Sequence, residues 1–250
     1  MQRVADAVAE YGYDGIELRL VDGALIDATT LPPTARDAVA SVLKQASVSV
    51  ACFDSSVRLT RPETFLELRA SLQLAHDLQA PFVRVFGGRA DPQAPSTGSH
   101  EEIGERLAPL LDVAESLDVT ILLETHDVFS SAASTSALLD HVSHPRLGAV
   151  WDIRHTWGAG ESPEQAAALL GDRLLHVHVK DARNTLDGLE LCFLGEGHVP
   201  VRESLAVLRR VGYTGWISVE WEKHWHPQLA EPEVAFPQHA AVLREWFQAT

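Results

Sequence analysis

Short apolar runs and amphipathic helical patterns alternate along almost the whole chain. Seven runs rich in Val, Ile and Leu, bounded by Gly, Asp or Pro, are typical of fully buried strands. These runs start near residues 15, 48, 82, 119, 148, 174 and 216. Between them, apolar residues recur at three- and four-residue spacing, which predicts helices. The predicted helices cover residues 4–11, 34–46, 63–78, 100–117, 134–142, 163–171, 201–212 and 239–249.

Regular alternation of strands and helices predicts an α/β protein with a parallel sheet and helices outside it. A (β/α)8 TIM barrel is favoured over an open doubly wound sheet for two reasons. No GxGxxG or GxxxxGK[ST] turn follows any of the strands. Polar side chains also recur at the carboxyl ends of the strands, which is where barrel active sites assemble.

The strand count falls one short of a full barrel. The chain opens with a helical pattern, so the first strand is missing from this sequence and seven strands are recognisable. Either that position stays open or another segment fills it. Because an unpaired strand edge favours association, we keep a homo-oligomer among the expected partners. No linker divides residues 1–250, and a length near 250 residues suits one TIM-barrel domain.

Composition narrows the class of protein. No apolar stretch approaches the roughly 20 residues of a membrane span, and the amino terminus lacks the apolar core of a secretory signal. Cys52 and Cys192 are expected to be buried, reduced thiols, which fits a cytoplasmic protein. The net charge is −15, and no basic stripe is present, so a nucleic-acid partner is not expected.

Polar residues at the ends of the last four apolar runs carry the predicted chemistry. They are Glu124, Asp152, His178 and Glu220. Charged groups at the end of a buried strand are costly to desolvate unless something compensates them. Three carboxylates and one imidazole suit a divalent cation such as Mn²⁺, Mg²⁺ or Co²⁺, and Zn²⁺ also accepts these ligands. The chain is therefore predicted to be a metal-dependent enzyme, with Mn²⁺ as the first choice.

The segments LLETHD, VWDIRHTW, HVHVKDAR, LGEGHVP and GYTGWISVEWEK resemble those of the xylose isomerase-like sugar isomerase/epimerase superfamily. The resemblance runs from about residue 12 to the end. In that superfamily Glu, Asp, His and Glu on the last four barrel strands bind the metal. The resemblance therefore implies Glu124, Asp152, His178 and Glu220 as ligands. His178 is preferred to His176 because the ligand in the family lies three residues before an acid, here Asp181.

Further residues are candidates for binding the substrate. The resemblance implies such a contact for His155, and Arg183 is similar to a substrate-binding Arg of ketose epimerases, although it lies one position nearer the His. His126 is a candidate proton shuttle or a partner that orients a ligand. Lys180 either meets a phosphate or a substrate oxygen or pairs with Asp181. Glu196 either lines the mouth of the site or forms a turn.

The leading hypothesis is isomerisation or epimerisation of a small sugar or sugar phosphate through a metal-stabilised enediolate. Glu124 and Glu220 would exchange a proton with the carbon beside the carbonyl. Two alternatives stay open: a metal-dependent lyase or dehydratase acting on a keto-sugar or sugar acid, and a degenerate, non-catalytic barrel subunit. The related abasic-site endonucleases are disfavoured by the acidic charge of the chain.

Overall fold

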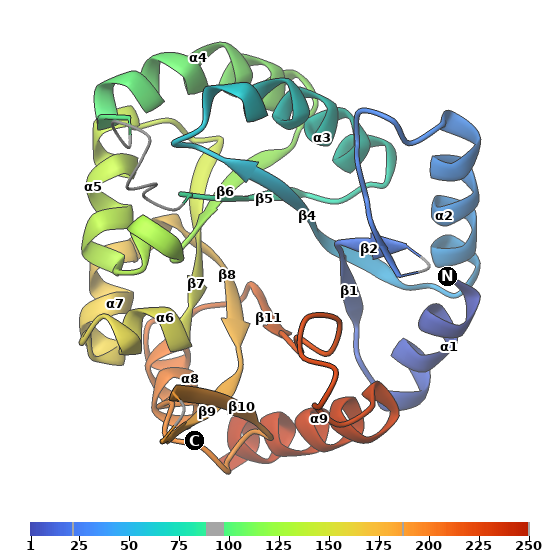
Figure 1. The fold of residues 1–250 in the computed structure, drawn as a ribbon, viewed down its shortest axis with the longest axis vertical. Coiled ribbons are helices and arrows are strands. Elements are labelled where there is room, and N and C mark those ends of the chain that lie inside the picture. Colours follow the sequence, from blue (N-terminus) through green and yellow to red (C-terminus); the bar gives the residue numbers. More distant parts are fainter. Residues whose placement is uncertain (22, 89–97, 187, 250) are drawn as a thin grey trace.

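The main feature of the molecule is a curved sheet of seven parallel strands that almost closes into a barrel (Figure 1). The computed structural model describes residues 1–21, 23–88, 98–186 and 188–249. In spatial order the strands are β1 (Gly15–Leu18), β4 (Ser49–Arg58), β5 (Phe82–Phe86), β6 (Thr120–Glu124), β7 (Leu147–Asp152), β8 (Leu174–Val179) and β11 (Trp216–Val219). Every neighbouring pair in this order is parallel.

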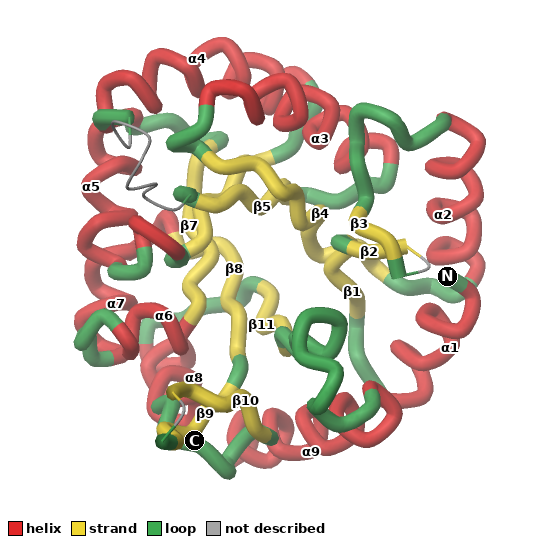
Figure 2. Tube along the Cα trace, in the orientation of Figure 1, coloured by secondary structure: helices red, strands yellow, loops and turns green. Residues whose placement is uncertain are grey.

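Helices surround the sheet, as the colouring by secondary structure in Figure 2 makes clear. They are α1 (Gln2–Tyr11), α2 (Pro33–Gln45), α3 (Phe65–Asp77), α4 (His100–Ser116), α5 (Ala132–Val142), α6 (Ile153–Gly158), α7 (Pro163–Leu170), α8 (Val201–Arg210) and α9 (Pro232–Ala249). Short 3-10 turns occur at η1 (Pro62–Thr64), η2 (Asp127–Phe129) and η3 (Gly171–Arg173). The seven predicted strands and the barrel fold are confirmed.

Two ends of the sheet, β1 and β11, face each other across an open seam. These strands pair only with β4 and β8, respectively, among the described strands. All residues of β6 and β7 are buried, whereas β11 and most of β1 are only half-buried. The central strands are covered because each has neighbours on both sides and helices outside. The sequence prediction that one strand position is missing is therefore confirmed, and its place is the seam.

Side chains, rather than a backbone ladder, connect the two sides of the seam. The hydroxyl of Tyr13, just before β1, donates a 2.9 Å hydrogen bond to the carbonyl of Phe236 in α9. The Arg244 guanidinium of α9 donates to the carbonyl of Gly12. The seam is thus held by a few polar contacts, in place of the regular hydrogen bonds that an eighth strand would supply.

Six elements differ from the sequence prediction. The ribbon β2 (Leu20–Val21) with β3 (Ala24–Leu25), the hairpin β9 (Asp181–Thr185) with β10 (Gly188–Cys192), and the helix α6 were not predicted. These elements are too short or too polar to show a clear hydrophobic period. Helix α9 was predicted from residue 239 but begins at Pro232 and continues through Pro237, although an internal proline usually ends a helix.

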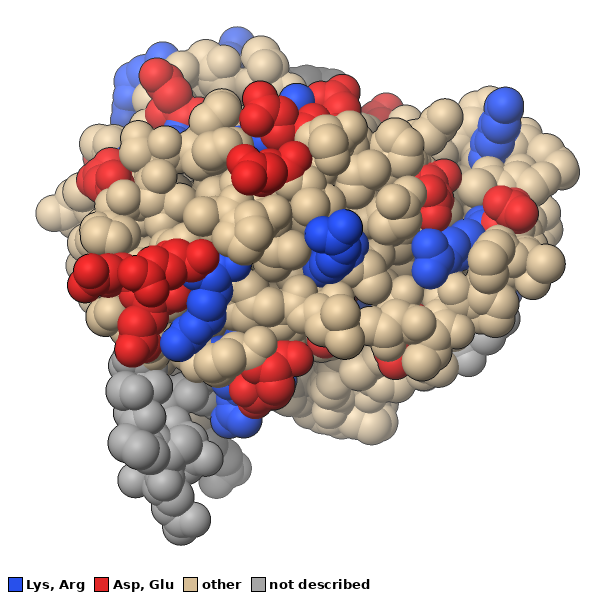
Figure 3. Space-filling model, turned by 90° about the horizontal axis from the view of Figure 1, so that it is seen from above, with Lys and Arg blue, Asp and Glu red and all other residues tan. Residues whose placement is uncertain are grey.

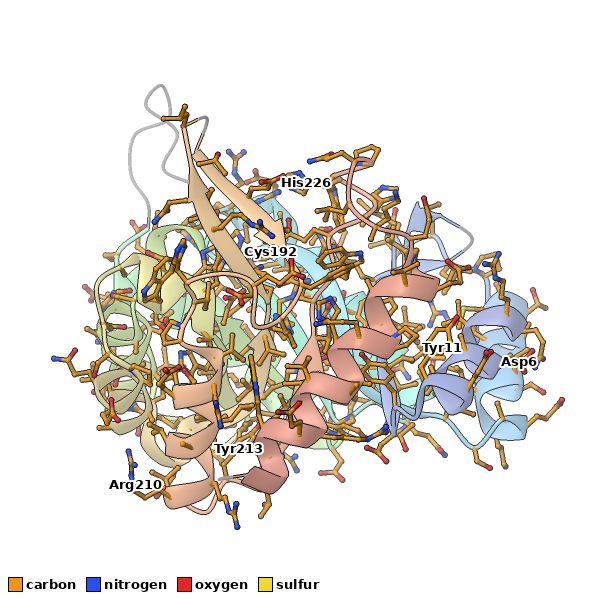
Figure 4. The ribbon with its side chains drawn as sticks, turned by 90° about the horizontal axis from the view of Figure 1, so that it is seen from below. Asp6, Tyr11, Cys192, Arg210, Tyr213 and His226 are labelled. Carbon is orange, nitrogen blue, oxygen red and sulfur yellow. The ribbon has the colours of Figure 1, made fainter. Side chains whose placement is uncertain are left out.

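The β9–β10 hairpin and the loop of residues 221–231 rise from the same end of the barrel. Figure 4 shows Cys192 at the base of the hairpin, with His226 of the loop on the same side and Tyr213 at the opposite end. The hairpin follows β8 and the loop follows β11, so both extend from the carboxyl ends of strands. Any site at this end therefore has the hairpin and the loop as its walls.

Candidate metal centre

Side chains from the carboxyl ends of four successive strands meet at one point. Glu124 and Asp152 end β6 and β7, His178 is the next-to-last residue of β8, and Glu220 follows β11. One ligand atom from each side chain lies within 4.8 Å of the others. Parallel strands bring their carboxyl ends to one end of the barrel, which explains the convergence. The structure thus brings together the four side chains that were predicted as metal ligands.

Unpaired polar atoms point to a cation as the missing partner of this cluster. Glu124 Oε1 and His178 Nδ1 are buried and have no hydrogen-bond partner among the described residues, and the equally buried Asp152 Oδ2 faces the Lys180 ammonium at 3.0 Å. Leaving such groups unsatisfied costs about 1–3 kcal/mol each, and more for charged groups. Carboxylate oxygens and one imidazole nitrogen are suitable ligands for Mn²⁺, Mg²⁺ or Zn²⁺. The residues present therefore fit a divalent cation.

A buried arginine supports Glu124 from the neighbouring strand. Arg84 of β5 contacts the Glu124 carboxylate at 3.3 Å and the Asp54 carboxylate at 3.2 Å. Burial by itself would raise the pKa of Glu124, but Arg84 and then His178 outweigh that effect and hold it below its ordinary value. Glu124 is therefore ionised at neutral pH, as a metal ligand must be.

Lys180 lies inside the cluster, next to three carboxylates. Its Nζ atom is 3.0 Å from Asp152 Oδ2, 2.5 Å from Glu220 Oε2 and 3.0 Å from Glu222 Oε1. Burial disfavours the ammonium, but these carboxylates raise the pKa of Lys180 well above its usual value. Lys180 is therefore a permanent cation that holds the two predicted ligands Asp152 and Glu220 together.

Asp181 does not pair with Lys180, which was one of the alternatives in the sequence analysis. Its carboxylate accepts four backbone N–H bonds, from Ala182, Gly195, Gly197 and Val199, at 2.8–3.1 Å. A Cβ atom on Gly197 would lie 2.1 Å from the carboxylate, so only glycine allows this approach. Asp181 thus fixes the loop that carries Glu196.

Glu17 of β1 joins the cluster from the seam side. Its Oε1 atom accepts a 2.7 Å hydrogen bond from His176 Nε2, and its Oε2 atom accepts a 3.1 Å bond from His178 Nε2. Burial alone would raise the pKa of Glu17, but His176 and His178 lower it well below the ordinary value. The carboxylate is therefore charged and fully engaged with two neighbouring imidazoles of β8.

Carboxylates outnumber basic side chains in the described part of this cluster. The acids are Glu17, Asp54, Glu124, Asp152, Glu220 and Glu222; the permanently basic side chains are Arg19, Arg84 and Lys180. His178 is also cationic without a metal, because Glu17 and Glu124 outweigh its burial and raise its pKa well above the ordinary value, and a metal on its ring would replace that proton. A divalent cation would bring the region close to neutral. The balance of charge therefore favours the same kind of ligand as the unpaired atoms do.

His155 and His126 lie beside the cluster with their rings together. The two ring centroids are 4.2 Å apart, and the His126 ring also contacts Phe86. His155 begins the first turn of α6, where its backbone N–H donates to Asp152 Oδ1 at 3.1 Å. Burial, followed by Lys180 and other nearby basic groups, lowers the pKa of His155 to about 2. His155 is therefore neutral at pH 7, and its Nδ1 accepts a 2.9 Å hydrogen bond from the Arg154 guanidinium, which leaves the proton on Nε2 as a donor.

Arg183 and Glu196 stand farther out. They form a 3.0 Å ion pair with each other, and both side chains are about half exposed, at 42% and 52%. Neither contacts the four predicted ligands in any polar interaction of the described residues. Their predicted role in binding a substrate is not tested by this arrangement, which places them on the hairpin wall of the site.

A large hollow adjoins the cluster. It has a volume of about 1590 Å³, follows the seam and reaches Glu17, Asp54, His178 and Glu220. A smaller hollow of about 280 Å³ is lined by residues that include His155, Trp157 and Leu189 of the hairpin, and by none of the four predicted ligands. A small ligand therefore has space beside His178 and Glu220, in the larger hollow.

Sequence reasoning missed Glu17, Asp54 and Arg84. Each lies within an apolar run that was correctly predicted as a strand, namely IELRL, VSVACFD and FVRVFGG. A charged residue in a buried strand is the signal that could have identified them, because such a group needs a partner. That signal was applied to the last four strands and overlooked in the first three.

Other features bear on the remaining predictions. Cys52 and Cys192 are buried, free thiols, as predicted. No helix in the described part of the chain is both long and apolar enough to cross a membrane. On the face shown in Figure 3, the described Lys and Arg side chains form small separate groups among Asp and Glu. That face therefore gives no electrostatic support to a phosphate-backbone partner.

Several known enzymes are similar to this chain in sequence or in structure. Fructoselysine 3-epimerase from Escherichia coli O157:H7 is 26% identical over 165 residues, which span 64% of this chain and 59% of the epimerase. The solved structure of an L-ribulose 3-epimerase matches 99% of this chain and 89% of its own with a TM-score of 0.80 at 16% identity. The crystal structure of the probable 3-DHS dehydratase AsbF from Bacillus anthracis matches 98% of this chain and 93% of its own, with a TM-score of 0.78 at 20% identity.

At these identities the two solved structures establish the fold alone, and the curated epimerase is matched over about three fifths of its length. The family assignment depends on a broader match. Residues 5–246 match the family model described as xylose isomerase-like TIM barrel. Because this match covers nearly the whole chain, the chain belongs to the xylose isomerase-like TIM barrel family.

Proposed function

We propose that this protein is a divalent-metal-dependent enzyme that epimerises or isomerises a small, unphosphorylated sugar. One observation carries the proposal: one ligand atom from each of the four predicted ligands lies within 4.8 Å of the others, and Glu124 Oε1 and His178 Nδ1 are buried without a hydrogen-bond partner among the described residues. The relationship to fructoselysine 3-epimerase supports a sugar substrate. When bound, the cation would act as a Lewis acid that stabilises negative charge on the carbonyl oxygen of the substrate.

The arrangement of the two glutamates supports their role in proton transfer. His178 Nδ1 is 3.6 Å from Glu124 Oε1 and 3.8 Å from Glu220 Oε2, so the two carboxylates flank the imidazole. Glu220 is one-third exposed and adjoins the larger hollow, whereas Glu124 is buried. We assign removal of the proton beside the carbonyl to one glutamate and its return to the other. Transfer from opposite faces inverts the carbon, which gives epimerisation.

Two of the three permanently basic side chains of the cluster disfavour a phosphorylated substrate. Arg84 and Lys180 are both buried and are both held by carboxylates of the cluster. A phosphate would have to displace these carboxylates, at the cost of leaving buried acids unpaired. His155, which is neutral, is placed to contact a sugar hydroxyl beside Asp152. Mn²⁺ is the proposed metal because its ligand preference matches this oxygen-rich set.

A deuterium-exchange assay tests this function directly. Protein stripped with a chelator and reloaded with Mn²⁺ is incubated in D₂O with a panel of unphosphorylated ketoses. The expected result is incorporation of one deuterium at the carbon beside the carbonyl, detected by NMR and mass spectrometry. Glu220→Gln should abolish the exchange, whereas Glu115→Gln, an exposed change of the same chemistry on α4, should leave it intact.

The same assay separates the alternatives. Loss of water from the sugar would identify a dehydratase instead of an epimerase. Near-normal exchange by Glu220→Gln would refute the assigned proton transfer. A purified protein that binds less than half an equivalent of divalent cation after Mn²⁺ supplementation would indicate a non-catalytic barrel.

A further inference from the structure

Glu17 reaches a predicted metal ligand from the far side of the seam. It lies on β1, the edge strand that pairs with β4 alone among the described strands. Its side chain extends into the barrel to His176 and His178 of β8, residues 159 and 161 positions away in the sequence. The carboxylate is only 11% exposed, and the two imidazoles are buried. This contact is therefore an interior bridge between the first and sixth strands of the sheet.

The two nitrogens of His178 have different surroundings. Nε2 is 3.1 Å from Glu17 Oε2. Nδ1 faces Glu124 Oε1 at 3.6 Å and Glu220 Oε2 at 3.8 Å, and it has no hydrogen-bond partner in the described structure. The nitrogen directed at the predicted metal position is thus Nδ1, while Nε2 is directed at Glu17.

An imidazole that binds a cation through Nδ1 keeps its remaining proton on Nε2. A carboxylate that accepts this proton fixes the tautomer, holds the ring orientation and makes the other nitrogen a better donor to the metal. Glu17 Oε2 is placed to accept that bond. His176 binds Oε1 at 2.7 Å and so fixes the rotation of the carboxylate.

From this geometry we propose that Glu17 is a positioning residue that sets the tautomer and orientation of His178 for binding a divalent cation through Nδ1. The inference rests on the proposed function, because it requires that His178 binds a metal. It also connects the metal centre with the seam. Because β1 is an edge strand, the stability of its pairing with β4 and the affinity for the metal become linked. Metal binding should stabilise β1, and a stable β1 should increase the metal affinity.

Metal affinity is the first test. Mn²⁺ binding by chelator-treated protein is measured from the electron paramagnetic resonance signal of free Mn²⁺, without any substrate. Glu17→Gln should raise the dissociation constant about 10- to 100-fold, because a neutral amide is a weaker acceptor for the Nε2 proton. Glu17→Asp keeps the charge and should recover part of the affinity. Glu10→Gln, an exposed change on the nearby α1, controls for the loss of one negative charge.

The tautomer of His178 is the second test, and it uses the wild-type protein. With Zn²⁺ bound, ¹⁵N NMR of the imidazole should show a proton on Nε2 and the metal on Nδ1. A metal on Nε2 would overturn the proposal even if Glu17→Gln does not fold. A folded Glu17→Gln variant that binds Mn²⁺ within twofold of the wild type would also overturn it.

The outcome for Glu17 is distinguishable from that for the proposed function. If the wild-type protein binds no divalent cation, both proposals fail. If the wild-type protein binds Mn²⁺ and Glu17→Gln binds it equally well, the metal centre stands and only the role of Glu17 is refuted. Hydrogen exchange adds a further check, because metal binding should slow exchange in β1 of the wild type and have less effect on β1 in Glu17→Gln.

Discussion

The closed arc of the barrel and its open seam differ in how they hold functional groups. In the closed arc, β6 and β7 are buried along their whole length and present Glu124 and Asp152. At the seam, β1 and β11 are mostly half-buried and present Glu17 and Glu220. Glu124 and Asp152 are almost inaccessible, whereas Glu220 is one-third exposed. Three of the four predicted ligands, Glu124, Asp152 and His178, are therefore fixed on strands with two neighbours, whereas Glu220 depends on side-chain contacts.

The interior strands therefore supply rigid ligands, and the seam supplies access for a substrate. A ligand on a strand with neighbours on both sides is preorganised by the sheet. A ligand beside the seam has room to move and borders the larger hollow. Lys180 and Glu17 compensate at the seam: Lys180 holds Glu220, and Glu17 holds β1 to β8.

Replacing Glu124 in the closed arc or Glu220 at the seam should abolish activity, but the two changes should lower the free energy of unfolding by different amounts. Glu124→Gln and Glu220→Gln should each lower turnover at least about 10³-fold, which corresponds to roughly 4 kcal/mol. Glu124→Gln should also cost about 3 kcal/mol of unfolding free energy, because it removes one carboxylate from the buried Arg84. Glu220→Gln should cost less, about 1 kcal/mol, because Glu220 is one-third exposed and the buried Lys180 keeps Asp152 and Glu222 as partners. Urea denaturation of metal-free protein measures the difference, and equal losses would contradict it.

Truncating an apolar side chain should reveal the same contrast without touching the centre. Leu123→Ala, in fully buried β6, should cost about 3 kcal/mol of unfolding free energy, as is usual for a core leucine. Ile217→Ala, in half-buried β11, should cost about 1 kcal/mol, because less apolar surface is buried there. Both values come from denaturant midpoints at a constant slope. A larger loss for Ile217→Ala would show that the seam is packed more tightly than its exposure indicates.

Hydrogen exchange should distinguish the two regions in the unmodified protein. Backbone amides of β6 and β7 should open only with global unfolding, whereas those of β1 and β11 should exchange through local opening. The difference in protection should be at least about 100-fold, or roughly 3 kcal/mol, measured by mass spectrometry of peptic fragments. Similar protection in both regions would mean that the side-chain bridges close the seam as firmly as a strand ladder does.

Acid should lower the free energy of unfolding through protonation of His239, which lies in α9 beside the seam. Its ring contacts Phe193 and Trp221, and burial lowers the pKa of His239 to about 4. The unfolded chain therefore takes up a proton below about pH 6.5, while the folded chain stays unprotonated until about pH 4. Stability is lost as the pH falls through this window, by about 2 kcal/mol between pH 6.5 and 5. His239→Leu should remove this part of the pH dependence, and an unchanged profile would refute the assignment.

The sequence allowed the strands to be placed accurately because each is a short apolar run with clear boundaries. Predicted starts near 82, 119 and 148 correspond to β5, β6 and β7, which begin at residues 82, 120 and 147. The four strand-end side chains were found by the same rule, since parallel strands place their carboxyl ends together. The hairpin of β9 and β10 was missed because β9 is largely polar and β10 alternates over only a few residues, Leu189 to Cys192, which is too short for a clear period.

Local sequence patterns could not predict which charged side chains pair across the barrel. Lys180 was expected to meet a substrate or Asp181, but it contacts Asp152, Glu220 and Glu222. That choice depends on how β7, β8 and β11 lie side by side. Asp181 instead serves the loop that carries Glu196, because the backbone N–H groups of that loop need an acceptor.

The repeating strand–helix order, the seven strands and the four strand-end donors are readable in the chain because each depends on residues close together in it. The contacts of Glu17 with His176 and His178, of Arg84 with Glu124, and of Lys180 with three carboxylates exist only in the folded barrel. The curved sheet brings together residues that are distant in the chain; Glu17 and His178, for example, are 161 positions apart. A buried charge then takes whichever partner the folded barrel places within reach.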